Sequence, residues 1–122
     1  MGDPELLRML AAEADRRGPA LIDGVEKLAG SGKKDPEQVE ELRVEAHGLK
    51  GAALVVGENR LAELARLMEA YLADCAEKGR IDPGSAATLI KAASAFSEGA
   101  QAAAEGITEP AAVGESLSAL GS

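Results

Sequence analysis

Aromatic residues are almost absent from this chain of 122 residues, since they make up 2% of it and tryptophan does not occur. Because hydrophobic residues still reach 46%, the core has to be built from alanine, leucine, valine and isoleucine, which favours closely packed helices. Cys75 is the only cysteine, which excludes an internal disulfide and a cysteine metal cluster and predicts a packed, inactive thiol. The length suits one domain.

Long apolar runs are also missing. No stretch approaches the roughly 20 apolar residues that span a bilayer, and the first residues lack the charged start and apolar middle of a signal peptide. We therefore expect a cytoplasmic protein. Basic residues are the minority, with 13 against 21 acidic residues and a net charge of −8, which argues against nucleic acid or an anionic membrane as a partner. A protein partner or a small cation fits this charge better.

Helix starts and ends are marked by proline and glycine. Three Asp-Pro pairs predict starts, because aspartate caps a helix and proline suits its first position; they lie at residues 3–4, 35–36 and 82–83. Glycines that can adopt the left-handed conformation at helix ends are Gly30, Gly57, Gly79 and Gly106. A fourth helix should start where Asn59 caps it, directly after Gly57. The predicted helices cover residues 4–29, 36–56, 59–78 and 83–105.

The first helix should kink or split at Gly18 and Pro19 into a short leader and a main helix. In the other helices apolar residues recur at steps of three and four, which predicts one buried stripe each. The stripes are Val39, Leu42, Ala46, Leu49, Ala53 and Val56, then Leu61, Leu64, Ala65, Met68 and Leu72, then Leu89, Ile90, Ala93, Phe96 and Ala100. This pattern predicts an all-α, antiparallel, up-and-down four-helix bundle over residues 1–105, with a short N-terminal leader helix. Residues 106–122 mix turn-forming and small residues, from which we predict a flexible C-terminal tail with a single helical turn.

The only histidine, His47, directly follows a residue of the second stripe. At 100° per residue it stands about 100° from Ala46, on the outer flank of the bundle. The residues within about 60° of it on the helical wheel are Glu40, Arg43, Lys50, Gly51 and Leu54. A glycine inside a helix costs about 1 kcal/mol relative to alanine. We interpret Gly51 as a residue that leaves open space, so that something large can reach the imidazole ring.

An exposed imidazole in this setting favours phosphoryl acceptance. A metal site would need further ligands at suitable spacing, and neither Cys75 nor any serine forms a recognisable nucleophile motif with His47. Imidazole keeps a substantial neutral fraction near neutral pH, and Arg43 and Lys50 should disfavour the protonated ring. The same two cations would attract the oxygens of an arriving phosphoryl group. On residue types alone, an idle surface histidine remains the alternative.

The stretch AHGLKGAALVVGENRLAELARLMEA, residues 46–70, resembles the signature of the histidine-containing phosphotransfer (HPt) domains of bacterial and plant phosphorelays. It has Ala-His-x-Leu-Lys-Gly, then small residues, then a glycine ten positions after the histidine and a helix rich in leucine and alanine. The resemblance implies that His47 takes a phosphoryl group from the aspartyl phosphate of one receiver domain and returns it to another. It also implies that Lys50 supports the phosphoryl group and that Gly51 gives access.

The resemblance further implies that the Mg²⁺ of the transfer belongs to the receiver, so that this chain needs no cofactor or metal of its own. Receiver domains of a hybrid histidine kinase and of response regulators are the expected partners of a monomer, contacted by Glu40, Arg43 and Leu54. Without an ATP-binding glycine-rich motif or a kinase signature, we expect a phosphoryl carrier and not an enzyme.

Other classes of protein fit less well. The alternative is a non-catalytic helical adaptor, or protein-interaction module, in which the histidine is incidental. An acyl carrier is disfavoured because Ser116 lies in the terminal tail and follows glutamate. A histidine-kinase dimerisation domain is disfavoured because Gly48 follows His47 and the next proline after His47 is Pro83.

Overall fold

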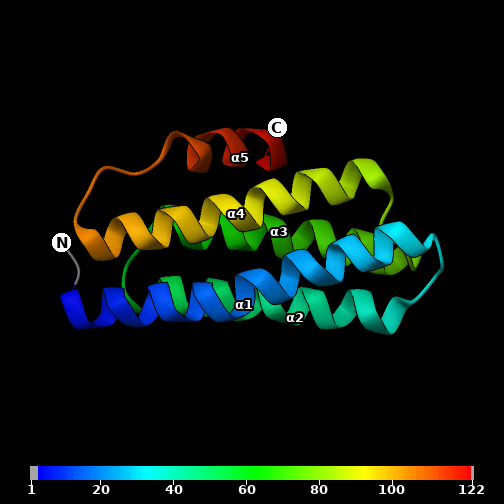
Figure 1. Cartoon of the computed structure of the whole chain (residues 1–122), viewed down its shortest axis with the longest axis horizontal. Helices are drawn as coiled ribbons and strands as arrows, with labels where there is room; N and C mark the ends of the chain where they lie inside the picture. Colours follow the sequence, from blue (N-terminus) through cyan, green and yellow to red (C-terminus); the bar gives the residue numbers. More distant parts are fainter. Residues whose placement is uncertain (1–2, 122) are drawn as a thin grey trace.

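This computed structural model describes residues 3–121, which form five helices and the turns that connect them (Figure 1). They are α1 (Pro4–Ser31), α2 (Pro36–Val55), α3 (Asn59–Lys78), α4 (Pro83–Glu105) and α5 (Ala111–Gly121). None of the described residues forms a strand. Helices α1 to α4 run alternately up and down, each packs against the next, and α4 closes the bundle against α1. The predicted all-α, antiparallel four-helix bundle is confirmed.

The three predicted Asp-Pro starts are confirmed as helix caps. The carboxylate of each aspartate accepts a hydrogen bond from a backbone N–H of the first turn, and proline occupies the first helical position. The pairs are Asp3 with Glu5, Asp35 with Gln38 and Asp82 with Ser85. The fourth start differs from the prediction, because Glu58 takes the capping position, with no side-chain cap, and Asn59 is the first helical residue.

Glycines in the left-handed conformation end three helices and form one turn. Gly79 (φ 76°) and Gly106 (φ 71°) end α3 and α4, and Gly57 (φ 75°) forms the turn between α2 and α3, as expected. The expectation for Gly30 is wrong. It lies inside α1, which continues to Ser31 and ends at Gly32 with φ 64°.

The predicted leader helix is also wrong, because α1 is one helix that continues through Pro19. Figure 1 shows its ribbon changing direction near the middle. Proline removes the helical hydrogen bond of the carbonyl at Asp15, but Asp15 and Pro19 are both exposed, so water can satisfy this carbonyl. On the inner side, Gly18 packs closely against α4, since an added Cβ would lie 2.7 Å from Ser97 Oγ. Contact with α4 therefore favours an unbroken helix.

The core follows the predicted stripes closely. Every predicted stripe residue is buried except Val56 and Ile90, which are half-buried against the core. Phe96 is the largest of the fully buried side chains, and the many alanines around it let the helices approach closely. Cys75 is a buried, free thiol, and burial raises its pKa. Within residues 3–121 we find no helix with the length and apolar character needed to cross a membrane.

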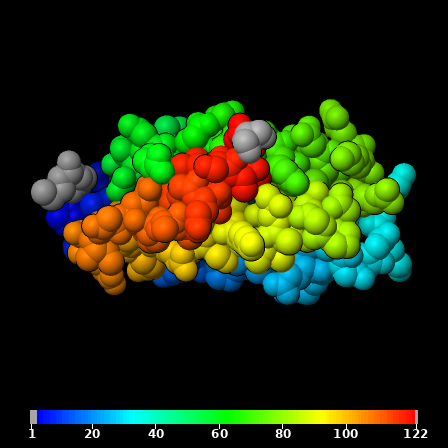
Figure 2. All heavy atoms as spheres, turned by 90° about the horizontal axis from the view of Figure 1, so that it is seen from above, coloured from blue at the N-terminus to red at the C-terminus, as the bar shows by residue number. Residues whose placement is uncertain are grey.

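The C-terminal region differs most from the expectation of a loose tail with a single turn. Residues Ala111–Gly121 form α5, which lies along the seam between α3 and α4 (Figure 2). Val113 is fully buried there, and Leu117 and Leu120 pack against the core. A Cβ added to Gly99 would lie 2.7 Å from Leu61 Cδ2 and 3.0 Å from Val113 Cγ2. This close approach is possible because position 99 carries no side chain.

The reason for this error is visible in the sequence. Val113, Leu117 and Leu120 have the i, i+4, i+7 spacing of a helix that buries one face, but glycine and serine between them weaken the pattern. Tertiary contacts supply what local propensity lacks. An ion pair of 2.9 Å between Arg60 Nε and Glu109 Oε1 also ties the connecting segment to the start of α3.

Candidate functional site

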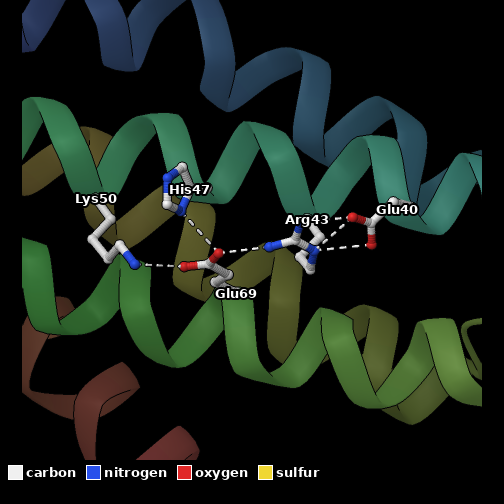
Figure 3. Close-up of polar contacts among 5 residues, drawn as sticks. All are labelled: Glu40, Arg43, His47, Lys50 and Glu69. Atoms are coloured by element: carbon white, nitrogen blue, oxygen red, sulfur yellow. Dashed lines mark hydrogen bonds and ion pairs between the residues drawn. The ribbon is translucent and has the colours of Figure 1, made fainter.

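His47 lies on the outer flank of α2, as the helical wheel predicts, and 61% of its side chain is exposed. Its neighbour Ala46 is fully buried, which fixes the orientation of this part of α2 against the core. The Nδ1 atom of the ring lies 2.9 Å from Oε2 of Glu69, which comes from α3 (Figure 3). A carboxylate only accepts hydrogen bonds, so this contact places a proton on Nδ1. In the neutral ring the free lone pair is therefore on Nε2.

The carboxylate of Glu69 joins His47 to two cations. Lys50 Nζ lies 2.9 Å from Oε1 of Glu69, and Arg43 Nη1 donates to Oε2 at 2.7 Å. Only 15% of the Glu69 side chain is exposed. Burial by itself would raise the pKa of Glu69, but hydrogen bonds from Lys50 and His47 outweigh it and lower the pKa. The carboxylate is thus held ionised between the ring and the cations.

Glu40 belongs to the same network through Arg43. Arg43 Nε donates to both carboxylate oxygens of Glu40 at 2.9 Å, and Nη2 donates to Oε1 at 2.6 Å. The hydrogen bond from Arg43 lowers the pKa of Glu40. Figure 3 shows the resulting chain of polar contacts between α2 and α3.

The expectation that Arg43 and Lys50 make the surface around the ring basic needs a correction. Arg43 and Lys50 both pair with Glu69, so the charged group in direct contact with His47 is a carboxylate. The prediction missed this because only α2 was placed on the helical wheel, whereas Glu69 approaches from α3.

Space beside the ring is confirmed at Gly51. A Cβ added to Gly51 would meet no atom within 4 Å, so close helix packing does not explain this glycine. The adjacent Gly48 differs, because an added Cβ would lie 2.5 Å from Cζ of Arg17. Gly51 leaves an open surface, whereas Gly48 makes room for a side chain from α1.

Exposed apolar side chains lie on the same helix as this open surface. The large hydrophobic residues most exposed within residues 3–121 are Met9, Val44, Leu54, Val55 and Ile107. Three of them lie on α2, and Met9 shares a groove with Val55 where α1 packs on α2. Apolar side chains gathered on one face are typical of protein contact surfaces.

The structure brings Glu40, Arg43, His47 and Lys50 into one polar network, while Gly51 and Leu54 lie further along α2 outside it. Glu69 is the site residue that the prediction missed. His47 and Glu69 are each eleven residues from Glu58 in the short turn, and residues equidistant from the turn of an antiparallel hairpin lie at the same level. Counting from this turn would have found the pair. Among the described residues no group of three or more His, Cys, Asp or Glu side chains is arranged to hold a metal ion.

Comparison with protein families agrees with this geometry. The family model for the Hpt domain matches residues 5–106. The chain belongs to the Hpt domain family. Hpt domains carry out histidine phosphotransfer in phosphorelays and are phosphocarrier modules without a kinase domain. Curated protein sequences give no significant match to the chain. Helix α5 lies beyond the residues that the Hpt model matches.

Proposed function

We propose that His47 accepts a phosphoryl group on Nε2 from the aspartyl phosphate of a receiver domain and passes it to another receiver. The observation that supports this role is the exposed ring whose Nδ1 is bonded to Glu69. With Nδ1 occupied, the lone pair on Nε2 is the nucleophile, and Figure 3 shows this nitrogen on the edge of the ring away from Glu69.

The transfer balances without a proton acceptor in this chain. The Nε2 lone pair forms a bond to phosphorus as the bond from phosphorus to the aspartyl oxygen breaks, and aspartate leaves as a carboxylate. The phosphorylated ring keeps its Nδ1 proton and gains positive charge, which the carboxylate of Glu69 at 2.9 Å stabilises. Glu69 is thus a positioning residue that sets the ring tautomer. In the return step the same bonds form and break in reverse on a second receiver.

Lys50 and Gly51 have separate roles in this proposal. Lys50 is 26% exposed and pairs with Glu69, from where its flexible ammonium group can turn toward the phosphoryl oxygens. Gly51, with no neighbour within 4 Å of an added Cβ, lets the loops of the receiver approach the ring. The Mg²⁺ ion that assists in-line transfer is supplied by the receiver.

The partners follow from the surface around the ring. Receiver domains of a hybrid histidine kinase and of response regulators would dock on the apolar residues Val44, Leu54 and Val55, with Glu40 and Arg43 giving polar contacts. We propose that the protein acts as a monomeric carrier in the cytoplasm, without enzymatic activity, metal or nucleic-acid partner of its own.

Transfer of labelled phosphate from a phosphorylated receiver tests this function. The unmodified protein should gain an acid-labile label, and His47→Gln should gain none, because the nucleophile is lost. The melting temperature should stay unchanged, since the ring is exposed and contributes little burial. A label that persists in His47→Gln would place the phosphorylation elsewhere. Receiver binding without any transfer to the unmodified protein would favour the adaptor.

A further inference from the structure

A third cation reaches the neighbourhood of His47, and it comes from α1. An added Cβ at Gly48 would lie 2.5, 2.6 and 2.8 Å from Cζ, Nη1 and Nε of Arg17. The guanidinium therefore lies directly against the backbone of the residue that follows His47. Glu69 approaches the ring from α3, whereas Arg17 approaches from α1. Any side chain at position 48 would occupy the place of this guanidinium.

The guanidinium of Arg17 is held in position by two hydrogen bonds that leave its Nη2 nitrogen unused. Nη1 donates to Oε1 of Glu45 at 2.8 Å, and Nε donates to Oε2 of Glu13 at 3.1 Å. Nη2 makes no hydrogen bond or ion pair to any other residue of the described chain. The side chain is 23% exposed, so it is ordered by its partners and still open to solvent.

The position of Nε2 determines on which side of the ring a phosphoryl group would lie. Figure 3 shows Nε2 on the ring edge away from Glu69, so a phosphoryl group on Nε2 extends away from the carboxylate that holds Lys50 and Arg43. A guanidinium binds phosphate oxygens as a planar fork, and the guanidinium of Arg17 lies beside the residue that directly follows His47. We propose that Arg17 is a phosphoryl-binding residue of this site and that Gly48 is the residue that admits it. The proposal rests on the proposed function of His47.

The charges around Arg17 are compatible with this role. Glu13 and Glu45 are the carboxylates that face it, and Glu13 also accepts from Arg16 Nη2 at 2.6 Å. Two carboxylates are thus matched by two guanidinium groups. A phosphoryl group would compete with Glu45 for one side of the fork, and the charge of Glu45 is the part of the site that opposes binding.

The test uses the full chain and phosphoramidate, a small phosphoryl donor that needs no receiver to dock. The rate of His47 phosphorylation and the phosphorus-31 chemical shift of the phosphohistidine are measured. Arg17→Gln should lower the rate about fivefold to tenfold and change the chemical shift, as expected for the loss of a charge-assisted hydrogen bond to the phosphoryl group. Arg17→Lys should restore part of the rate, because it keeps the charge but loses the planar fork.

Arg16→Gln is the matched control. Arg16 pairs with the same Glu13 but is 64% exposed, and the three atoms nearest a Cβ at Gly48 all belong to Arg17, so substitution of Arg16 should change neither measurement. The melting temperatures of all variants show how much the contact between Arg17 and Glu45 stabilises the fold. The phosphorylation rates show separately whether phosphoryl binding is lost. A variant Arg17→Gln that melts lower but is phosphorylated at the normal rate would overturn the proposal.

Gly48→Ala tests the same contact from the other side. The added Cβ displaces the flexible end of Arg17 and favours the helix, so the protein should melt at the same or a higher temperature while phosphorylation slows. In the Arg17→Gln background, Gly48→Ala should have no further effect. An equal effect in both backgrounds would overturn the proposal. Failure of the unmodified protein to become phosphorylated at His47 would overturn the proposed function, and this inference with it.

Discussion

Two regions of the bundle each contain a glycine inside a helix, and the two glycines have opposite surroundings. Around Gly51, beside His47, an added Cβ would meet nothing within 4 Å. Around Gly99, under α5, an added Cβ would lie 2.7 Å from Leu61 and 3.0 Å from Val113. Gly51 leaves a surface open, whereas Gly99 lets α5 of the same chain cover a surface. The residue type alone does not distinguish these purposes, but the neighbouring element does.

The side chains around the two glycines differ in the same way. The α2 face near Gly51 carries a charged network and exposed apolar residues such as Leu54. The seam under α5 is filled by apolar side chains, with the ion pair between Arg60 and Glu109 at its end. The proposed partner surface thus lies on α2, whereas the surface between α3 and α4 is already covered by α5.

Leucine at these two glycines gives the largest expected effects. Gly99→Leu should lower the free energy of unfolding by about 3 kcal/mol, because the seam has no room for a side chain. Gly51→Leu should leave this free energy unchanged and slow transfer from a receiver by about a hundredfold, because the receiver can no longer approach the ring. Urea unfolding followed by circular dichroism and labelled phosphotransfer measure the two quantities.

Intermediate side chains at Gly51 sharpen the comparison. Gly51→Ala should be neutral or stabilise by up to about 1 kcal/mol, and Gly51→Gln should give a transfer rate between those of alanine and leucine. If stability and transfer fell together along this series, Gly51 would be a packing residue like Gly99, and the access interpretation would be wrong.

Lys50→Ala should have a smaller effect, confined to the open face. We expect transfer to slow about tenfold while the dissociation constant of the receiver changes little, because Lys50 acts on the moving phosphoryl group. Single-turnover transfer and receiver titration separate the two terms. A normal transfer rate with a raised dissociation constant would make Lys50 a docking residue.

The smallest expected effect is the contribution of Glu69 to stability and its dependence on pH. The pKa of Glu69 is lowered from 4.5 in the folded protein, so its ionised form favours folding above about pH 4.5, and this contribution is lost as the pH falls through the folded pKa. Relative to the unmodified protein, Glu69→Gln should lose about 1 kcal/mol at pH 7, and this loss should shrink as the pH falls through the folded pKa of Glu69. Urea unfolding at pH 7 and at lower pH values measures this, and a difference that does not vary with pH would mean that Glu69 contributes through packing alone.

Features that depend on local chemistry could be predicted from the sequence. The caps at Asp3, Asp35 and Asp82 need only a carboxylate before a proline, and they are confirmed. The outward position of His47 needs only the period of one helix. Both kinds of signal lie within a few neighbouring residues of one element.

Features that depend on contacts between elements were missed. Glu69 enters the site from α3, so the sequence pattern of α2 does not predict its contact with His47. Helix α5 has only 11 residues, glycine and serine interrupt its apolar pattern, and it is ordered by the burial of Val113 against α3 and α4. Pro19 predicts a kink or a split in the first helix, but packing of Gly18 on α4 keeps α1 continuous. In each case the deciding contact joins residues far apart in the sequence.

The short turn between α2 and α3 has a consequence for how the site forms. The polar network from Glu40 to Glu69 lies within one helical hairpin, so its contacts form without the other helices, and the longest of them spans 26 residues. We therefore expect the ring, its carboxylate and its cations to come together as soon as this hairpin closes. Opening of α5, at the far end of the chain, would leave the assembled hairpin in place.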